Sequence, residues 1–163
     1  MNLIVNAFQW INDLQFSDDI RSSFWMFPAF ETIHVIAIVF VLGSIVRLDM
    51  RLMGLIWRNR PVTEVADEML PWTWTAFVIA AIFGSMLWMS KPMTYFGIAF
   101  FDAKMILMLL AGINMLVFQY VTFRNVRVWD RDPIPPAAAR FQGSLSMAFW
   151  LCVVICGRFI GFV

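Results

Sequence analysis

The sequence has one histidine, two cysteines and few charged residues, and these scarcities exclude several classes of function. Charged residues make up 14% of the 163 positions and the formal net charge is +1, so no basic surface for nucleic acid is expected. With a single histidine, one protomer cannot hold a haem between two imidazoles or form a three-histidine zinc or copper site. No phosphate-binding loop is present, and no serine stands in a pattern typical of a hydrolase.

The two cysteines, Cys152 and Cys156, are four residues apart in an apolar run and therefore share one helical face. A disulfide at this spacing within one helix would be strained. We interpret both as small packing residues, and the alternative is a soft-metal site.

Apolar residues, in contrast, make up 61% of the chain, well above the roughly 45–50% that is usual in soluble domains. A soluble chain of this length needs polar groups over its surface, so lipid must replace water around much of this protein. Crossing a bilayer core takes about 20 apolar residues in a helix. The sequence predicts four transmembrane helices, over roughly 24–46, 70–89, 101–123 and 144–162.

Residues 3–14 precede the first apolar segment and alternate apolar and polar side chains at near-helical spacing. This pattern predicts a short amphipathic helix in the membrane interface. The expected fold class is therefore all-α: an integral membrane bundle of four transmembrane helices with an N-terminal interfacial amphipathic helix, in a single domain over 1–163. Short connections between the helices favour antiparallel neighbours.

Eight of the twelve basic residues lie in two of the predicted loops. They are Arg47, Arg51, Arg58 and Arg60 in the first loop and Arg124, Arg127, Arg131 and Arg140 in the third. Cytoplasmic loops are enriched in lysine and arginine, so both loops are predicted to face the cytoplasm and both termini the periplasm. The predicted location is the bacterial inner (plasma) membrane, where lipids surround the protein.

Ionisable residues inside the apolar segments are predicted to converge on the outer half of the bundle. They are Glu31, His34, Asp102, Lys104 and Arg158. Ionisable groups at membrane depth are costly, and for that reason they usually mark a functional site. This layer is the strongest functional indication in the sequence.

Glu31 and His34 are three residues apart and therefore share a helical face. One interpretation is a structural polar pair that holds the first helix against Arg158 or Lys104. A second is that His34 binds a metal or a haem iron while Glu31 orients the imidazole. A third is a proton relay through Glu31 and His34 to the outer face.

Lys104 and Arg158 also have two interpretations each. A long basic side chain near a helix end can extend to the membrane surface. Alternatively, both bind an anion such as a haem propionate, with Asp102 competing for the charge of Lys104. Gly157 and Gly161 flank Arg158 and allow a backbone or a flat ligand to approach closely.

For the segment RLDMRLMG, residues 47–54, one interpretation is a local ion network through Arg47, Asp49 and Arg51 that fixes the loop after the first helix. The alternatives are solvated charges, or a site that docks a partner or an anionic lipid. In the inner half of the third helix, the Asn114 amide is expected to hydrogen-bond across helices.

Four stretches carry a family resemblance: PAFETIHVIAIVFVLGSIVRLDMRLMG, LPWTWTAFVIAAIFGSMLWMS, FDAKMILMLLAGINMLVFQ and ICGRFIGF. Together they resemble an uncharacterised family of small bacterial four-helix inner-membrane proteins, over roughly residues 28–161. The resemblance implies the four-helix fold and transfers no function. The matching positions are Glu31, His34, Gly43, Asp49, Arg51, Lys104, Asn114 and Arg158.

A fold-level resemblance rests on His34 in the first helix, the glycine and arginine that follow it, and Lys104 at the start of the third helix. In these features the chain is similar to HemJ-type protoporphyrinogen oxidases, CopD-like copper-resistance proteins and b561-type cytochromes. The resemblance implies a haem or copper site inside the bundle. The chain departs from these families at Asn114 in the third helix, because no second histidine is present.

The leading functional prediction is a small membrane protein that binds haem b, or another redox cofactor, with His34 as the metal ligand. Glu31 would orient His34, and Lys104 and Arg158 would neutralise anionic groups of the cofactor. One alternative is a non-catalytic structural or accessory subunit of a membrane complex, and another is a small oligomeric transporter. A homo-oligomer or a partner membrane subunit is expected, and the sequence does not decide whether the protein is an enzyme.

Overall fold

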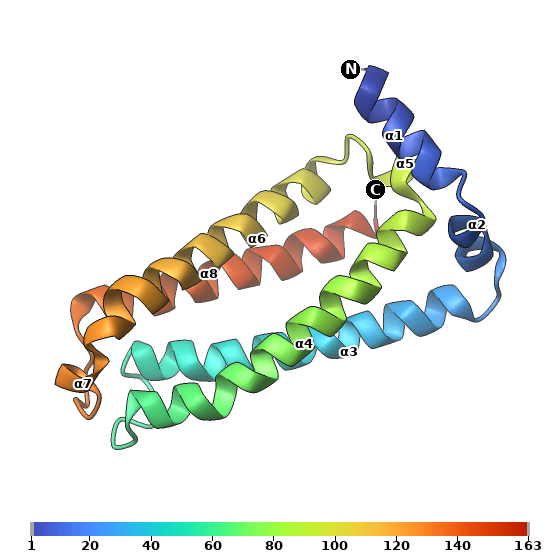
Figure 1. Cartoon of the computed structure of the whole chain (residues 1–163). Coiled ribbons are helices and arrows are strands. Elements are labelled where there is room, and N and C mark those ends of the chain that lie inside the picture. Colours follow the sequence, from blue (N-terminus) through green and yellow to red (C-terminus); the bar gives the residue numbers. More distant parts are fainter. Residues whose placement is uncertain (1, 163) are drawn as a thin grey trace.

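The computed structural model describes residues 2–162, with side chains described from Val5 onwards. Regular structure in these residues is helical throughout (Figure 1). The helices long and apolar enough to cross a membrane are α3 (Met26–Leu52), α4 (Val62–Ser90), the continuous run Ala99–Trp129 and α8 (Ala137–Ile160). The predicted all-α fold with four potential transmembrane helices is confirmed.

The run Ala99–Trp129 is not a uniform helix. It begins with α6 (Ala99–Val117), continues through a π-helical turn at Phe118–Thr122 and a 3₁₀ turn at Phe123–Asn125, and ends with α7 (Val126–Trp129). Single π-helical turns within longer helices frequently lie at functional sites. Apolar composition alone does not indicate this change of helix type, so the sequence predicted one regular helix.

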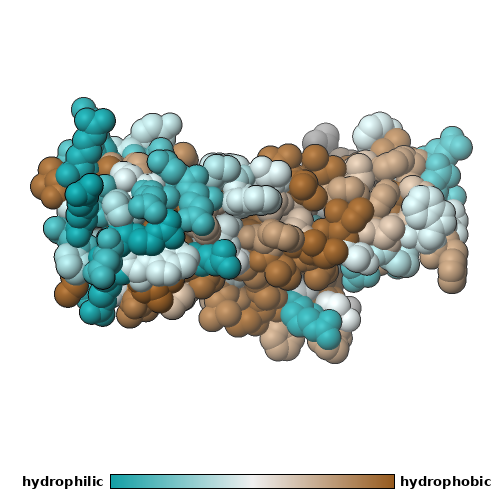
Figure 2. All heavy atoms as spheres, turned by 90° about the horizontal axis from the view of Figure 1, so that it is seen from below, coloured by the Kyte–Doolittle hydropathy of each residue, from teal (hydrophilic) through white to brown (hydrophobic). Residues whose placement is uncertain are grey.

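The two ends of the bundle differ in character. We call the end formed by the loops after α3 and α7 the Arg-rich end, and the opposite end, where Figure 1 places both chain termini, the terminal end. In Figure 2, hydrophilic residues gather at the end that contains α7, and apolar residues cover the middle of the visible face. This distribution fits a protein whose middle is surrounded by lipid.

At the Arg-rich end, the long helices extend beyond the apolar segments from which they were predicted. Helix α3 continues to Leu52, while α4 begins directly after Pro61 and α8 directly after Pro136. Hydropathy marks the residues that lipid can surround, whereas a helix continues wherever its backbone hydrogen bonds are satisfied. The helices therefore carry polar turns beyond the apolar segments.

The predicted N-terminal helix over 3–14 is present as α1 (Asn2–Asn12), and a second short helix that was not predicted, α2 (Gln15–Ser22), follows it. The Ser17 hydroxyl donates a hydrogen bond of 2.7 Å to the backbone oxygen of Ile11 at the bend between them. Phe8 in α1 makes edge-to-face contacts with Trp88 and Phe96, each with ring centroids 5.4 Å apart. These contacts hold α1 against the terminal end of α4 and the loop that contains α5 (Pro92–Tyr95).

The long helices form two hairpins. Helix α3 packs along α4, and α6 packs along α8. The hairpins meet where α3 contacts α8, whereas α4 and α6 hardly touch within the described residues. At the α3–α8 contact, a Cβ on Gly143 would lie 3.0 Å from the backbone oxygen of Asp49 and 3.1 Å from the Leu52 Cβ. Glycine therefore permits the close approach of the two helices.

The main hydrophobic cluster lies at the Arg-rich end. Its buried members are Leu48, Leu52, Val62, Val65, Ala66, Met69, Phe118, Val126, Trp129 and Ala139. They come from α3, α4, α7, α8 and the π-helical turn, so this cluster ties both hairpins together.

Arg51 lies beside this cluster and is 0% exposed. Its Nε donates a 2.9 Å hydrogen bond to the backbone oxygen of Arg60, and its Nη2 donates a 3.1 Å bond to that of Asp132. The ion network considered for residues 47–51 does not form, because Arg51 binds these loop carbonyls and Arg47 is exposed. Asp49 is buried, and no ion pair of the described residues includes it. Arg51 thus connects the first loop to the third.

Asp130 strengthens the same connection by capping α4. Its carboxylate accepts hydrogen bonds from the Thr63 backbone N–H at 2.8 Å and from the Thr63 hydroxyl at 2.9 Å. Its backbone oxygen accepts a 3.0 Å bond from the Val62 N–H. A carboxylate at a helix N-terminus satisfies free N–H groups and interacts favourably with the helix dipole. The cap comes from a residue distant in sequence, so local sequence patterns do not indicate it.

Replacing Arg51 tests whether this connection stabilises the fold. Arg51→Leu is expected to lower the free energy of unfolding by on the order of 2–4 kcal/mol, because loop carbonyls would lose a buried charged donor. The matched control is Arg47→Leu, on the same helix but exposed, which is expected to change it by less than about 0.5 kcal/mol. Denaturation followed by circular dichroism in detergent measures both, and equal stability of the two variants would contradict this role.

Candidate functional site

His34 projects from α3 against α4 in the terminal half of the bundle. Its Nδ1 lies 2.7 Å from the backbone oxygen of Ala80 in α4. A carbonyl oxygen only accepts, so in the neutral ring the proton is on Nδ1 and the lone pair is on Nε2. None of the described residues makes a hydrogen bond to Nε2. This is the arrangement that prepares a histidine to bind a metal through Nε2.

Gly84 provides the space for the imidazole ring. It lies one helical turn after Ala80, and a Cβ at this position would be 2.6 Å from His34 Cε1 and 3.1 Å from His34 Nδ1. No real Cβ approaches another atom so closely, so any larger residue would displace the ring. Ala80 and Gly84 form the small-xxx-small spacing that permits close helix contact in membranes.

Glu31 and Lys104 lie in the same half of the bundle as His34. Both are within electrostatic range of the imidazole. Lys104 is partly buried between α6 and α8, where a Cβ on Gly157 would be 3.6 Å from its Nζ. Glu31 is exposed on α3. The fold thus brings together an imidazole, a carboxylate and an ammonium group from two hairpins.

Arg158 does not join this group through an ion pair. Its guanidinium lies 4.9 Å from the centroid of the Phe162 ring, and the side chain is exposed. Asp102 is exposed as well. The ion pairs of the described residues include no pairing of Glu31 with Arg158 or Lys104, so the expected structural pair is not formed.

Metal-ligating side chains do not cluster in the part of the chain that is described. No group of three or more His, Cys, Asp or Glu residues is placed to hold a metal ion there. Cys152 and Cys156 are both free thiols. A metal bound at His34 would therefore draw its other ligands from a cofactor or from another chain.

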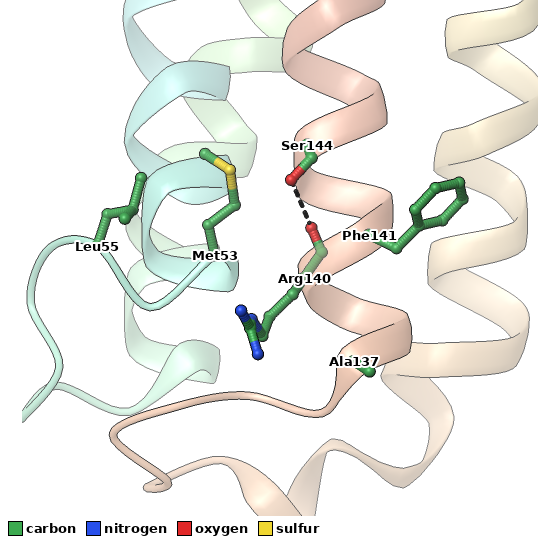
Figure 3. Close-up of a pocket in the computed structure, with 6 residues that line it drawn as sticks. All are labelled: Met53, Leu55, Ala137, Arg140, Phe141 and Ser144. Carbon is green, nitrogen blue, oxygen red and sulfur yellow. Dashed lines mark hydrogen bonds between the residues drawn. The ribbon is translucent and has the colours of Figure 1, made fainter.

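A shallow groove of about 440 Å³ lies at the Arg-rich end, as Figure 3 shows. It runs between the loop after α3 and the first turns of α8. Its lining residues are Met53, Leu55, Ala137, Arg140, Phe141 and Ser144. The Ser144 hydroxyl donates to the backbone oxygen of Arg140 at 2.9 Å, and the single charged side chain of the lining, that of Arg140, is exposed. The groove therefore has no buried polar group with which to bind a ligand.

Sequence reasoning missed Ala80 and Gly84. Their spacing was visible in the sequence, but only the fold shows that His34 is the residue packed against them. The prediction for Asn114 is confirmed: its Nδ2 donates a 3.2 Å hydrogen bond to the backbone oxygen of Gln142, across α6 and α8.

The fold and this site define a small helical protein with four potential membrane spans. Residues 9–163 match the Family of unknown function (DUF6644), and the chain belongs to this family. No curated protein and no solved structure matches the chain. The expected uncharacterised family is thereby confirmed, whereas no match supports the likeness to HemJ-type oxidases, CopD-like proteins or b561-type cytochromes.

The single histidine makes the tautomer of His34 directly measurable. In the protein labelled with ¹⁵N-histidine, the imidazole is expected to show a protonated Nδ1 and an unprotonated Nε2, because Ala80 accepts from Nδ1. Gly84→Ala is expected to shift the Nδ1 resonance by displacing the ring. The control is Gly112→Ala, since a Cβ there meets nothing within 4 Å. A protonated Nε2 in the wild type would contradict the assignment.

Proposed function

We propose that this protein is an accessory subunit of a membrane redox complex in which His34, through Nε2, would be one of the protein ligands of a haem b. The observation that carries the proposal is the 2.7 Å contact between His34 Nδ1 and the Ala80 carbonyl, which leaves Nε2 without a partner among the described residues. A ligating histidine is typically oriented by such a backbone carbonyl at its other nitrogen.

The residues present fit one ligand of a haem and not two. His34 is the only histidine, so a second imidazole would be His34 of another copy or a residue of a partner subunit. This requirement links cofactor binding to assembly, and it explains why a four-helix protein of this size would act as a subunit. When bound, the haem would supply one-electron redox chemistry.

Each residue around His34 has a separate role in this proposal. Ala80 fixes the tautomer, and Gly84 leaves room for the ring in that orientation. Lys104 would neutralise an anionic propionate, and what supports this role is that its side chain is partly buried and has no ion pair among the described residues. Glu31 is exposed on the same side of α3 and would orient the second chain or the haem edge.

The second candidate function is an accessory subunit without a cofactor. It is favoured by the same hydrogen bond, since an imidazole that joins α3 to α4 also stabilises the bundle on its own. The two candidates differ in whether the isolated protein carries a chromophore.

An absorption spectrum of the protein, gently purified from its native membrane and combined with metal analysis, tests the cofactor proposal. The expected result is a Soret band that shifts on reduction, with stoichiometric iron. His34→Ala is expected to lose at least about 90% of the haem while remaining inserted, and added imidazole is expected to restore it. Gly112→Ala serves as a remote control that retains the spectrum.

Two outcomes would contradict the cofactor proposal. Full haem occupancy in His34→Ala would exclude His34 as the ligand. A colourless, iron-free wild-type protein would favour the accessory subunit without a cofactor, and a lower melting temperature of His34→Ala would then identify the imidazole as a structural link.

A further inference from the structure

A cavity of about 230 Å³ lies between the two hairpins, toward the Arg-rich end and away from His34. All four long helices contribute to its wall. Trp74 and Phe77 of α4 and Trp150 of α8 supply aromatic surface, and Met108 and Met115 of α6 supply flexible apolar surface. A concave, mostly apolar site with a few polar groups is typical of small-molecule binding.

Among the residues that the structure describes, two buried polar atoms of this wall have no hydrogen-bond partner. Asp49 is 4% exposed, and its Oδ2 is buried with no hydrogen-bond partner among the described residues. The Oε1 of Gln142, on α8, is also buried in this wall and has no partner among the described residues. Asn114 does not supply the missing hydrogen bond to either atom, because its Nδ2 donates to the backbone oxygen of Gln142. Both unpartnered atoms are acceptors, so the missing group is a donor.

The carboxylate also lacks a positive partner. Arg51 is two residues further along α3, but its guanidinium donates to loop carbonyls. Arg47 is exposed, and none of the ion pairs of the described residues includes Asp49. A buried, unpaired carboxylate is costly, so an occupant that brings both a positive charge and a donor would compensate it.

The aromatic residues favour the same kind of occupant. The faces of indole and phenyl rings attract cations, and they accommodate the apolar part of a ligand at the same time. Trp74, Gly112 and Gln119 line the cavity and are exposed, on the side where α4 and α6 hardly touch. The cavity therefore communicates with the surface between these two helices, where lipid would surround the protein.

The wall also contains the irregular part of the third long helix. Phe118 and Gln119, both in the π-helical turn, line the cavity. A π-helical turn widens the helix locally and is commonly retained where a ligand binds.

We propose that this cavity binds a small lipophilic amine in its protonated form, taken up between α4 and α6. The ammonium group donates to Asp49 Oδ2 and Gln142 Oε1, and the apolar part of the amine packs against Trp74, Phe77 and Trp150. A neutral alcohol or phenol would satisfy a hydrogen bond and leave the charge of Asp49 uncompensated. This site is independent of His34 and of the proposed haem.

Two probes of the same shape distinguish charge recognition from apolar binding. Phenethylammonium and 2-phenylethanol are titrated into the full-length protein in detergent by calorimetry, with empty micelles as the blank. The expected result is saturable 1:1 binding of the amine, with at least about tenfold higher affinity than the alcohol, corresponding to about 1.4 kcal/mol. Equal affinities, or no saturable binding of the amine, would overturn the proposal.

Asp49→Asn tests the carboxylate itself while keeping the shape of the side chain. It is expected to lower the affinity for the amine about tenfold or more, to the level of the alcohol, and to leave the alcohol unaffected. The control is Asp67→Asn, an exposed acid on α4 outside the cavity wall, which is expected to change neither affinity. Unchanged amine affinity in Asp49→Asn would show that Asp49 is not the charged partner and would overturn the proposal.

Ala111→Leu provides a test that does not alter any polar group. Ala111 lines the cavity and is 5% exposed, so the larger side chain is expected to occupy part of the space and weaken both probes several-fold. Circular dichroism and a melting curve check that each variant is folded. If Asp49→Asn does not fold, the ratio of amine to alcohol affinity in the wild type and the weaker binding of both probes to Ala111→Leu still decide the proposal.

Discussion

The close approach of α3 and α8 at Gly143 is the contact on which the other features of the bundle depend. In lipid, helices gain little from hiding apolar surface from one another, so small residues and polar bonds determine where they meet. A Cβ at Gly143 would lie 3.0 Å from the backbone oxygen of Asp49, which shows how tightly the two helices are joined. Because α4 and α6 hardly touch, the α3–α8 contact joins the hairpins and leaves the cavity between them.

The Arg-rich end stabilises this arrangement with interactions that are typical of a soluble protein. The buried Arg51 holds loop carbonyls, and Asp130 caps α4 from a distant loop. These bonds lie beside the main hydrophobic cluster. The terminal half has a different character: its polar side chains are mostly exposed, and the His34–Ala80 bond and the Gly84 space join α3 to α4 there.

The two halves contain the two proposed sites, and each half suits a different kind of binding. His34 lies in the less tightly closed half, and a second chain could approach its free Nε2. Asp49 is buried in the wall of a cavity whose unpartnered buried polar atoms, among the described residues, are both acceptors. A ligand shared between chains suits the first site, and a small molecule that dissolves in lipid suits the second. The physical distinction is between a ring nitrogen with no hydrogen-bond partner among the described residues and a buried carboxyl in no ion pair of those residues.

The sequence by itself determined the fold class, the four apolar helices and the interhelical bond of Asn114, because hydropathy and helical spacing are local properties. It also indicated that His34 and Glu31 share a face. Only the tertiary structure decided that Ala80 and Gly84 face His34, that Arg51 binds loop carbonyls and that Asp49 lines a cavity. These features arise where segments distant in sequence meet, and the pattern of a single helix does not specify which neighbour it contacts.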